Sequence, residues 1–352
     1  MAETDFDQEV FEYWIPRLVA DGVDANDIQS VRPKVKSWND WPDAWASIGK
    51  QHLQFAKEQE TENNFTTAGE AFVKASLCYH VGQVVAGKTP EKKKELQIQK
   101  EFAFEAGSKY LLPPAHKIEI DFNGVSLPGY LRLPPNGGKP TSCVILVPGL
   151  DSTKEDFITL SEMCIRRNLA SFAFDGPGQG EVHKHLTLSE GYENSILSVF
   201  EEISSKPEID PNRIGLLGRS LGGYFILRAA AKNPAIASLA VFGGCYDLSD
   251  WNNMPKTILD GFLWATGSTD YDKARKLMGA ATLDDCLSEV NAPTIVVHGK
   301  RDAIFHYTQA EKIIETLGEQ AEGHIAEDGV HCCHNYSFRY RNLMADWFVK
   351  TL

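Results

Sequence analysis

Residues 214–223 read Ile-Gly-Leu-Leu-Gly-Arg-Ser-Leu-Gly-Gly, and they constrain the architecture more than any other part of the chain. The apolar run 214–217 is typical of a buried strand, and a helix-like run follows over 224–231. Between them, a G-x-S-x-G pattern forms a turn so tight that only small residues fit beside the serine. The turn lifts the hydroxyl group of Ser220 clear of the sheet. The segment therefore predicts that Ser220 is a nucleophile. The alternative is a glycine-rich turn whose serine has no catalytic role.

Further short apolar runs, each bounded by Gly, Pro or Asp, surround this segment. They lie at 143–147, 171–174, 239–242 and 294–297. Helical stretches separate most of them, which indicates an α/β fold with a mostly parallel sheet covered by helices on both faces. A hairpin of strands 117–122 and 126–133, joined around Asn123-Gly124, precedes them.

The chain before this sheet reads as helical. Its clearest signal is a stripe of residues spaced three or four apart, namely Trp38, Trp41, Trp45, Ile48, His52 and Phe55. We interpret the stripe as helix–helix core; a ligand-binding aromatic box is the alternative. Leu112-Pro113-Pro114 ends the helical pattern, which predicts a helical domain over 1–112 and a second domain over 113–352. An amphipathic excursion at about 247–290 reads as a cap inserted over the sheet.

Local signals place the ends of the N-terminal helices. Asn39 and Asp40 precede Trp41-Pro42, an expected cap followed by a first-turn proline. The stretch 67–70 reads as a capping box for a helix over 71–85, and Thr89-Pro90 opens a third helix to about Ala106.

Composition excludes several partners. The chain has 352 residues, 43% of them hydrophobic, and a net charge of −13 that is spread along its length. Such a charge repels nucleic acid. No apolar run approaches about 18 residues, so no membrane span is expected. Seven cysteines without a regular framework and an acidic start at 1–7 predict reduced thiols and a cytoplasmic protein.

A nucleophilic serine needs a base and an orienting acid, in the chain order Ser, Asp or Glu, His. Asp302 follows the strand 294–297 and is the expected acid; Asp247, after the preceding strand, is its rival. His331, in the loop after a strand at 323–326, is the expected base, and His334 is its competitor.

Two backbone N–H groups should stabilise the oxyanion, and we expect those of Leu221 and Leu150. The loop 175–181, Asp-Gly-Pro-Gly-Gln-Gly-Glu, is interpreted as a structural turn rather than a phosphate cradle, because it lacks a Lys-Ser/Thr ending. His331-Cys-Cys-His334 does not have the spacing of a zinc site, so neither a metal nor a cofactor is expected.

Four motifs together resemble the α/β-hydrolases, and in particular the bacterial 2,6-dihydroxypseudooxynicotine hydrolase group, which includes relatives of fungal heptaketide hydrolases of pigment synthesis. The motifs are 149–155, 175–181, 218–223 and 328–335. The helical part, including 41–45 and 67–80, is similar to the N-terminal domain of that group. The resemblance implies hydrolysis of a carbon–carbon bond next to a ketone, in an aryl ketone or 1,3-dicarbonyl. It also implies a homodimer whose helical domain covers the site.

The substrate is expected to be small, neutral and aromatic, with Trp251, Trp264 and Asp247 of the cap as candidate binding residues. The resemblance also implies an additional carboxylate in the cap; here 251–254 offers none, although Asp247 and Asp250 are near. A carboxylesterase using the same three residues is the second hypothesis, and a binding protein on an inactive scaffold is the third.

Overall fold

The computed structural model describes residues 6, 10–86, 89–135, 139–279 and 281–352. The acidic stretch 1–7, from which a cytoplasmic protein was predicted, lies outside the described residues except for Phe6. Contacts divide the chain into two compact units. One comprises 118–154 and 160–352, and the other comprises 2–117 together with 155–159. We describe each unit by itself.

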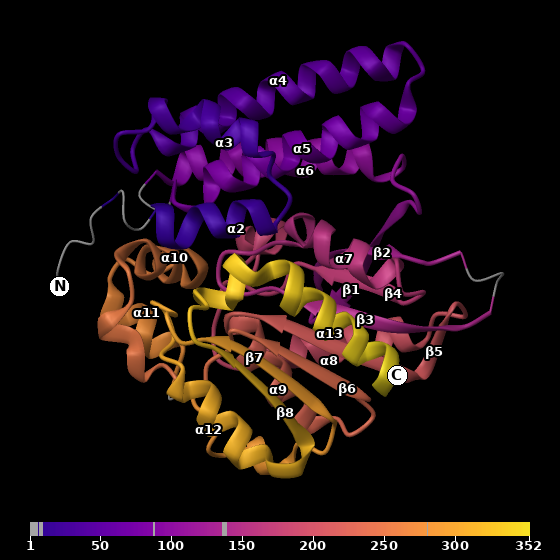
Figure 1. Cartoon of the computed structure of the whole chain (residues 1–352), viewed down its shortest axis with the longest axis vertical. Helices are drawn as coiled ribbons and strands as arrows, with labels where there is room; N and C mark the ends of the chain where they lie inside the picture. Colours follow the sequence, from indigo (N-terminus) through magenta and orange to yellow (C-terminus); the bar gives the residue numbers. More distant parts are fainter. Residues whose placement is uncertain (1–5, 7–9, 87–88, 136–138, 280) are drawn as a thin grey trace. The chain divides into compact units, whose positions relative to one another are not determined.

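The smaller unit is helical (Figure 1). Its helices are α2 (Ile15–Ala20), α3 (Ala25–Val31), α4 (Trp41–Thr61), α5 (Phe65–Val84) and α6 (Pro90–Ser108), with a π-helical turn η1 (Val10–Trp14) and a 3₁₀ turn η2 (Arg32–Lys34). Helix α5 packs against both α4 and α6. Its small residues allow close approach: a Cβ built on Gly69 would lie 2.6 Å from Tyr110 Cβ, and one on Gly82 would lie 3.2 Å from Pro42 O.

The predicted helix start at Trp41 is confirmed, with Asp40 at the N-cap position and Pro42 in the first turn, whereas the start predicted from 67–70 is wrong. The Asp40 carboxylate does not cap α4; it accepts hydrogen bonds from the N–H groups of Lys36 and Ser37 in the preceding turn. Helix α5 begins at Phe65, so the expected capping box at 67–70 lies inside the helix. At Asp40 the N–H groups of the preceding turn compete for the carboxylate, although the helix begins where it was predicted to begin.

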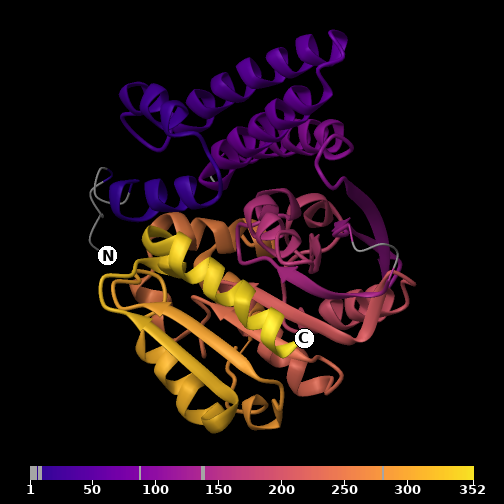
Figure 2. The ribbon, with the colours of Figure 1, turned by 45° about the vertical axis from the view of Figure 1, so that its right-hand side comes forward.

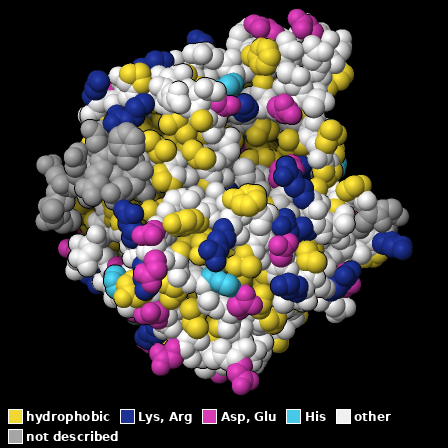
Figure 3. All heavy atoms as spheres, viewed as in Figure 1, with side chains coloured by type: hydrophobic (Ala, Val, Ile, Leu, Met, Phe, Trp, Pro, Cys, Tyr) yellow, Lys and Arg dark blue, Asp and Glu magenta, His cyan; other side chains and the backbone are white. Residues whose placement is uncertain are grey.

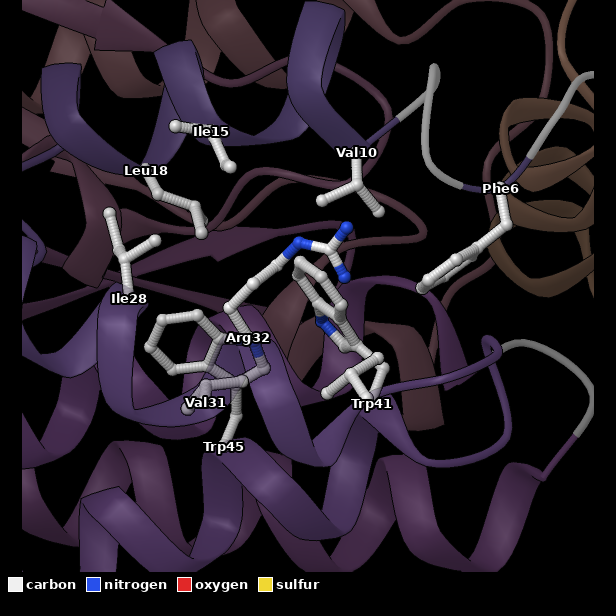
Figure 4. A pocket seen from close by; sticks show the side chains of 10 residues that line it. Phe6, Val10, Ile15, Leu18, Ile28, Val31, Arg32, Trp41 and Trp45 are labelled. Carbon is white, nitrogen blue, oxygen red and sulfur yellow. The ribbon is translucent and has the colours of Figure 1, made fainter.

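The tryptophan stripe is part of the core of this unit. Trp38 precedes α4 rather than belonging to it, but its ring still packs against that of Trp41, with centroids 5.4 Å apart. Trp41 and Trp45 are buried, and Trp41 Nε1 donates to Val81 O at 2.8 Å. The two rings border a small cavity that is lined mainly by aliphatic side chains and by the Arg32 side chain (Figure 4).

Buried charges hold the segment 155–159 within the helical unit. Lys100 Nζ lies 3.0 Å from Glu155 Oε2, and neither side chain is more than 1% exposed. His80 Nε2 lies 3.1 Å from Asp156 Oδ2, which Arg17 also approaches. Charges buried this deeply require partners, so these contacts fix a segment that is distant in sequence from the helices.

The larger unit is built on one sheet of eight strands in the order β1-β2-β4-β3-β5-β6-β7-β8 (Figure 1 and Figure 2). The strands are β1 (Ala115–Phe122), β2 (Val125–Arg132), β3 (Thr141–Val147), β4 (Ala170–Phe174), β5 (Ile209–Arg219), β6 (Ser238–Phe242), β7 (Thr294–Gly299) and β8 (Ala321–Ala326). Strand β2 pairs with β4 antiparallel, and every pairing from β4 to β8 is parallel. The predicted hairpin turn is confirmed, since Asn123 and Gly124 both have positive φ.

Helices cover both faces of this sheet, and Figure 1 shows α13 in front of the strands and α9 behind them. They are α7 (Ile158–Ile165), α8 (Glu193–Ser204), α9 (Leu221–Lys232), α12 (Thr308–Leu317) and α13 (Ser337–Thr351), with 3₁₀ turns η4 (Lys154–Phe157), η5 (Gly180–Lys184), η8 (Gly318–Gln320) and η9 (His331–Tyr336). Strands β3 and β6 are completely buried, as continuous apolar strands between helix layers should be. The predicted α/β-hydrolase fold is confirmed.

An excursion of mostly helical structure separates β6 from β7. It contains η6 (Ser249–Asn253), α10 (Lys256–Thr266), α11 (Tyr271–Leu277) and η7 (Leu287–Glu289).

Acidic and basic side chains are interspersed on the face of the molecule that Figure 3 shows. Among the described residues, none of the helices combines the length and apolar character that crossing a membrane requires.

Candidate active site

Ser220 occupies a strained turn between β5 and α9. Its backbone has φ +56° and ψ −128°, a conformation that costs a non-glycine residue about 1–3 kcal/mol. The flanking glycines are needed for close approach: a Cβ on Gly218 would lie 2.3 Å from Gly222 O, and one on Gly222 would lie 2.4 Å from Val147 O. The surrounding backbone therefore holds the serine in place.

Ser220, His331 and Asp302 form a continuous chain of contacts. His331 Nε2 lies 2.8 Å from Ser220 Oγ, and His331 Nδ1 lies 2.6 Å from Asp302 Oδ2. The other carboxylate oxygen of Asp302 accepts the N–H groups of Ile304 and Phe305 at 2.8 and 3.0 Å. The side chains of Asp302 and His331 are almost completely buried. The acid is thus held rigidly, and it fixes the orientation of the imidazole ring.

The two rival residues from the sequence make contacts of other kinds. The Asp247 carboxylate accepts the N–H of Ser249 at 2.8 Å and Gln309 Nε2 at 3.1 Å, so its bonds brace the β6–η6 loop. The His334 ring packs edge-on against Phe242, with centroids 6.1 Å apart. Of the pairs left open by the sequence, the structure places Asp302 and His331 beside Ser220.

The loop that carries His331 has an unusual backbone. Cys332 and Cys333 both have positive φ, at +51° and +43°. Cys332 Sγ donates to Phe242 O at 3.2 Å, and the same carbonyl accepts the N–H of Ser220 at 2.7 Å. A Cβ on Gly243 would lie 2.7 Å from that sulfur atom. One carbonyl at the end of β6 therefore anchors both the serine turn and the histidine loop.

The acid and the base shift each other's pKa in the directions that stabilise a charged pair. Burial by itself lowers the pKa of His331, but the Asp302 charge and hydrogen bond outweigh it, and the pKa is raised. Burial by itself raises the pKa of Asp302, but His331 and backbone donors outweigh it, and that pKa is lowered. Asp302 is consequently a buried carboxylate that stabilises a protonated His331.

The two predicted oxyanion donors lie next to the serine. A Cβ built on Gly149 would lie 3.5 Å from Ser220 Oγ, so the Gly149–Leu150 peptide borders the hydroxyl group. Leu221 is the first residue of α9, and the first N–H groups of a helix have no acceptor within the helix. Both N–H groups belong to segments that adjoin Ser220.

Buried polar contacts secure the segment that carries Leu150, which we call the oxyanion loop (148–153). Directly after it, Lys154 Nζ lies 2.7 Å from both Asp175 Oδ2 and Glu181 Oε1. Within it, Ser152 Oγ accepts Arg219 Nη2 at 2.6 Å. Neither Lys154 nor Arg219 has a role that the sequence alone predicts, although the lysine and the two carboxylates all stand in the motifs 149–155 and 175–181.

The glycine-rich loop 175–181 folds around its own carboxylate. The N–H of Glu181 donates to Asp175 Oδ2 at 3.1 Å, and a Cβ on Gly180 would lie 1.9 Å from that oxygen. A negative charge thus occupies the position where a phosphate-binding loop would hold its ligand. This agrees with the structural interpretation of the loop.

The two cap tryptophans make contacts of different kinds. Trp251 is buried, and its ring centroid lies 4.7 Å from that of Phe262. Trp264 is partly exposed and stacks on His183, with centroids 4.2 Å apart and planes at 8°. Trp251 is thus part of the core of the cap, whereas Trp264 offers an aromatic face near η5.

Helix α10 is the part of the cap that reaches the oxyanion loop. A Cβ on Gly261 would lie 3.2 Å from Leu150 Cδ2. Ile258 and Ala265, three residues before and four after Gly261, share its face of the helix. The cap therefore presents an apolar surface beside the proposed donor.

Comparison with known proteins identifies the family. Residues 35–274 match the family model described as Esterase FrsA-like. The chain is 31% identical to the 2,6-dihydropseudooxynicotine hydrolase of Paenarthrobacter nicotinovorans, over 96% of this chain and 91% of that protein. It is 29% identical to the 20-hydroxy-prefusarin hydrolase FUS2 of Gibberella moniliformis, over 63% of this chain and 57% of that protein.

A solved structure agrees with this assignment. The crystal structure of 2,6-dihydroxy-pseudo-oxynicotine hydrolase matches with a TM-score of 0.89 and 31% identity, covering 96% of this chain and 95% of that one. The family model spans more than half of the sequence, and the likeness extends through the sheet and the helical unit alike. The chain is therefore an α/β-hydrolase that belongs to the FrsA-like esterase family.

Proposed function

We propose that this hydrolase cleaves a carbon–carbon bond next to a ketone, in an aryl ketone or 1,3-dicarbonyl substrate, with Ser220, His331 and Asp302 as its catalytic residues. The observation that carries the proposal is the contact of His331 with both Ser220 Oγ, at 2.8 Å, and Asp302 Oδ2, at 2.6 Å. The type of bond is proposed from the likeness to the 2,6-dihydropseudooxynicotine hydrolase, which extends over 96% of the chain.

The first step is attack on the ketone. Ser220 Oγ bonds to the carbonyl carbon while His331 Nε2 takes the hydroxyl proton, and Asp302 stabilises the resulting imidazolium. The carbonyl π electrons move to oxygen, and the N–H groups of Leu150 and Leu221 donate to this oxyanion. Because these donors are backbone groups in a braced loop and a helix end, they need no reorganisation.

The second step breaks the carbon–carbon bond. The electron pair leaves with the carbon atom next to the second carbonyl, as an enolate, and that carbon takes the proton from His331. The acyl group stays on Ser220 as an ester. A water molecule, deprotonated by His331, then releases the acyl group as a carboxylic acid. The sum is addition of one water across the cleaved bond.

Asp247 and Asp250, the two carboxylates near the position where a cap carboxylate was sought, are held by other contacts. Asp250 Oδ2 accepts the N–H of His306 at 2.9 Å and Gln309 Nε2 at 3.1 Å, and Asp247 shares the Gln309 amide. Both carboxylates are engaged in bracing the base of the cap. The proposal therefore assigns protonation of the leaving enolate to His331 alone.

The walls of the site favour a small, neutral and apolar substrate. The α10 face of Ile258, Gly261 and Ala265 lies beside Leu150, and the buried Asp302 carboxylate disfavours anionic groups. Trp264 supplies an aromatic face on the same helix. The expected homodimer and the cytoplasmic location stay predictions.

A carboxylesterase acting through the same residues is the second candidate, and the family name favours it. The test compares an aryl 1,3-diketone with an aryl ester of the same acyl group. We expect kcat/KM to be at least about tenfold higher for the diketone. The reason is that a site built for the proposed reaction stabilises a transition state in which an enolate departs, and only the diketone forms one. Turnover of the ester without any cleavage of the diketone would instead assign the chain to the esterases.

The pH dependence should reflect the raised pKa of His331. A general base must be neutral, and the neutral fraction grows as pH rises through the pKa. Because Asp302 raises this pKa, the rate of labelling by a fluorophosphonate should rise with pH and reach half its maximum above the ordinary histidine value of about 6.5. Labelling rates measured from pH 5 to 10 test this. A midpoint at or below the ordinary value would contradict it.

A further inference from the structure

The side-chain amide of Gln179 connects the glycine-rich loop to the oxyanion loop. Gln179 is buried, and its Nε2 atom lies 2.5 Å from Gly149 O and 3.3 Å from Pro148 O. The Gly149 carbonyl shares its peptide group with the Leu150 N–H, and the Pro148 carbonyl belongs to the peptide group before it. One side chain thus donates to two consecutive peptides of the segment that borders Ser220.

The orientation of this amide is determined by its other contacts. Gln179 Oε1 accepts the N–H of Gly176 at 3.0 Å and the hydroxyl group of Tyr192 at 2.7 Å. A backbone N–H can only donate, so the atom facing it must be the amide oxygen. The NH₂ group consequently faces the oxyanion loop. Tyr192 is itself fixed, because it is buried and stacks on Phe225 with centroids 4.0 Å apart.

Peptide geometry carries this orientation to the reacting atoms. In a trans peptide the C=O and the following N–H point in opposite directions. Holding Gly149 O toward Gln179 therefore points the Leu150 N–H away from Gln179, within the same peptide plane. Gly149 lies against the serine, since a Cβ built on it would be 3.0 Å from Ser220 Cβ and 3.5 Å from Ser220 Oγ.

We propose that Gln179 is a positioning residue, which holds the Gly149–Leu150 peptide so that its N–H faces the oxyanion formed at Ser220. This inference rests on the proposed function, in that it requires a serine nucleophile. It does not depend on which bond is cleaved. If the Gln179 amide is removed, the Gly149–Leu150 peptide can rotate and its N–H no longer faces the oxyanion. The side chains that touch the substrate are unchanged by this removal.

The test replaces Gln179 with methionine, which keeps the length of the side chain and removes the donor. The readout is inactivation by a fluorophosphonate, because phosphonylation of Ser220 also develops charge on oxygen. We expect the maximal inactivation rate to fall about 10²-fold, the effect of losing one oxyanion donor, with half-saturation changed less than about threefold. Affinity for an aryl trifluoromethyl ketone should fall similarly, and that for the matched methyl ketone should not.

Gln309→Met is the matched control. Gln309 is also buried, and its Oε1 accepts the N–H groups of Tyr246 and Asp247 away from the oxyanion loop. It should lower the thermal midpoint about as much as Gln179→Met while leaving the inactivation rate near that of wild type. Equal rates in folded Gln179→Met and Gln309→Met would overturn the proposal and reduce Gln179 to a structural role.

Tyr192→Phe keeps the test decisive if Gln179→Met does not fold. It removes one bond to Gln179 Oε1 and preserves the ring that stacks on Phe225. We expect a fall of about three- to tenfold in the maximal inactivation rate, since a single neutral hydrogen bond is lost. An unchanged rate in this variant would also overturn the proposal. Failure of the wild type itself to react would refute the proposed function and, with it, this inference.

Discussion

Ser220→Ala should lose labelling by a fluorophosphonate completely, and its kcat/KM on any carbonyl substrate should fall at least about 10³-fold. Alanine removes the only atom that bonds to the substrate, while its smaller side chain fits the same turn. His331 and Asp302 would remain in contact but would have no hydroxyl group to deprotonate. Covalent labelling detected by intact mass, together with turnover of the aryl diketone and ester, measures both effects.

Ser238→Ala is a suitable control for this experiment. Ser238 is a buried serine at the start of β6, and its hydroxyl group bonds Thr351 Oγ1 at 2.7 Å. Because the carboxyl ends of the parallel strands carry Ser220, this position lies at the opposite end of the sheet. We expect full labelling and a loss of about 1 kcal/mol in the free energy of unfolding. Labelling of Ser220→Ala at the wild-type level would refute the nucleophile.

Asp302→Asn should lower kcat by about 10³- to 10⁴-fold, whereas Asp247→Asn should change it only a few-fold. Asparagine has the shape of aspartate, so the fold is preserved, but its neutral amide neither stabilises an imidazolium nor selects the reactive tautomer of His331. The carboxylate also raises the pKa of His331, so its removal should move the pH midpoint of labelling downward. Steady-state kinetics and the pH profile of both variants provide the measurement.

The two aspartates are a matched pair. Each follows a strand that ends at the same edge of the sheet, and each accepts backbone N–H groups. They differ in their side-chain partners: Asp302 Oδ2 lies 2.6 Å from His331 Nδ1, whereas Asp247 Oδ1 accepts Gln309 Nε2. A larger loss in Asp247→Asn than in Asp302→Asn would reverse the assignment of the acid.

Much of the fold could be predicted because its signals are local. A continuous apolar run such as 143–147 must be buried on both sides, and Asn123-Gly124 suits a two-residue turn wherever it occurs. Side-chain caps of helices were less predictable than the positions at which α4 and α6 begin. Asp40 had the right residue type for a cap, but the N–H groups of the preceding turn competed for its carboxylate.

The candidate site divides in the same way. Ser220 and His331 follow from a motif and from chain order, since strand ends at one edge bring distant residues together. Asp302 is the expected acid, but the sequence leaves Asp247 open as its rival, because two neighbouring strands end at that edge and the loop backbone decides which carboxylate reaches the imidazole. Gln179 could not be found at all, since its role depends on a contact with carbonyl groups 30 residues away.

The buried charges at 155–159 bear on how this chain can be cut and recombined. Glu155 and Asp156 belong spatially with the helical unit, where Lys100 and His80 face them, yet the gene encodes them after β3. The helical unit is therefore not an interchangeable cassette at the front of the gene. A chimaera that joins these helices to another hydrolase keeps a partner for the buried Lys100 only if the recipient supplies an acidic residue at the position of Glu155. Recombination between relatives should preserve the two segments as one linked block.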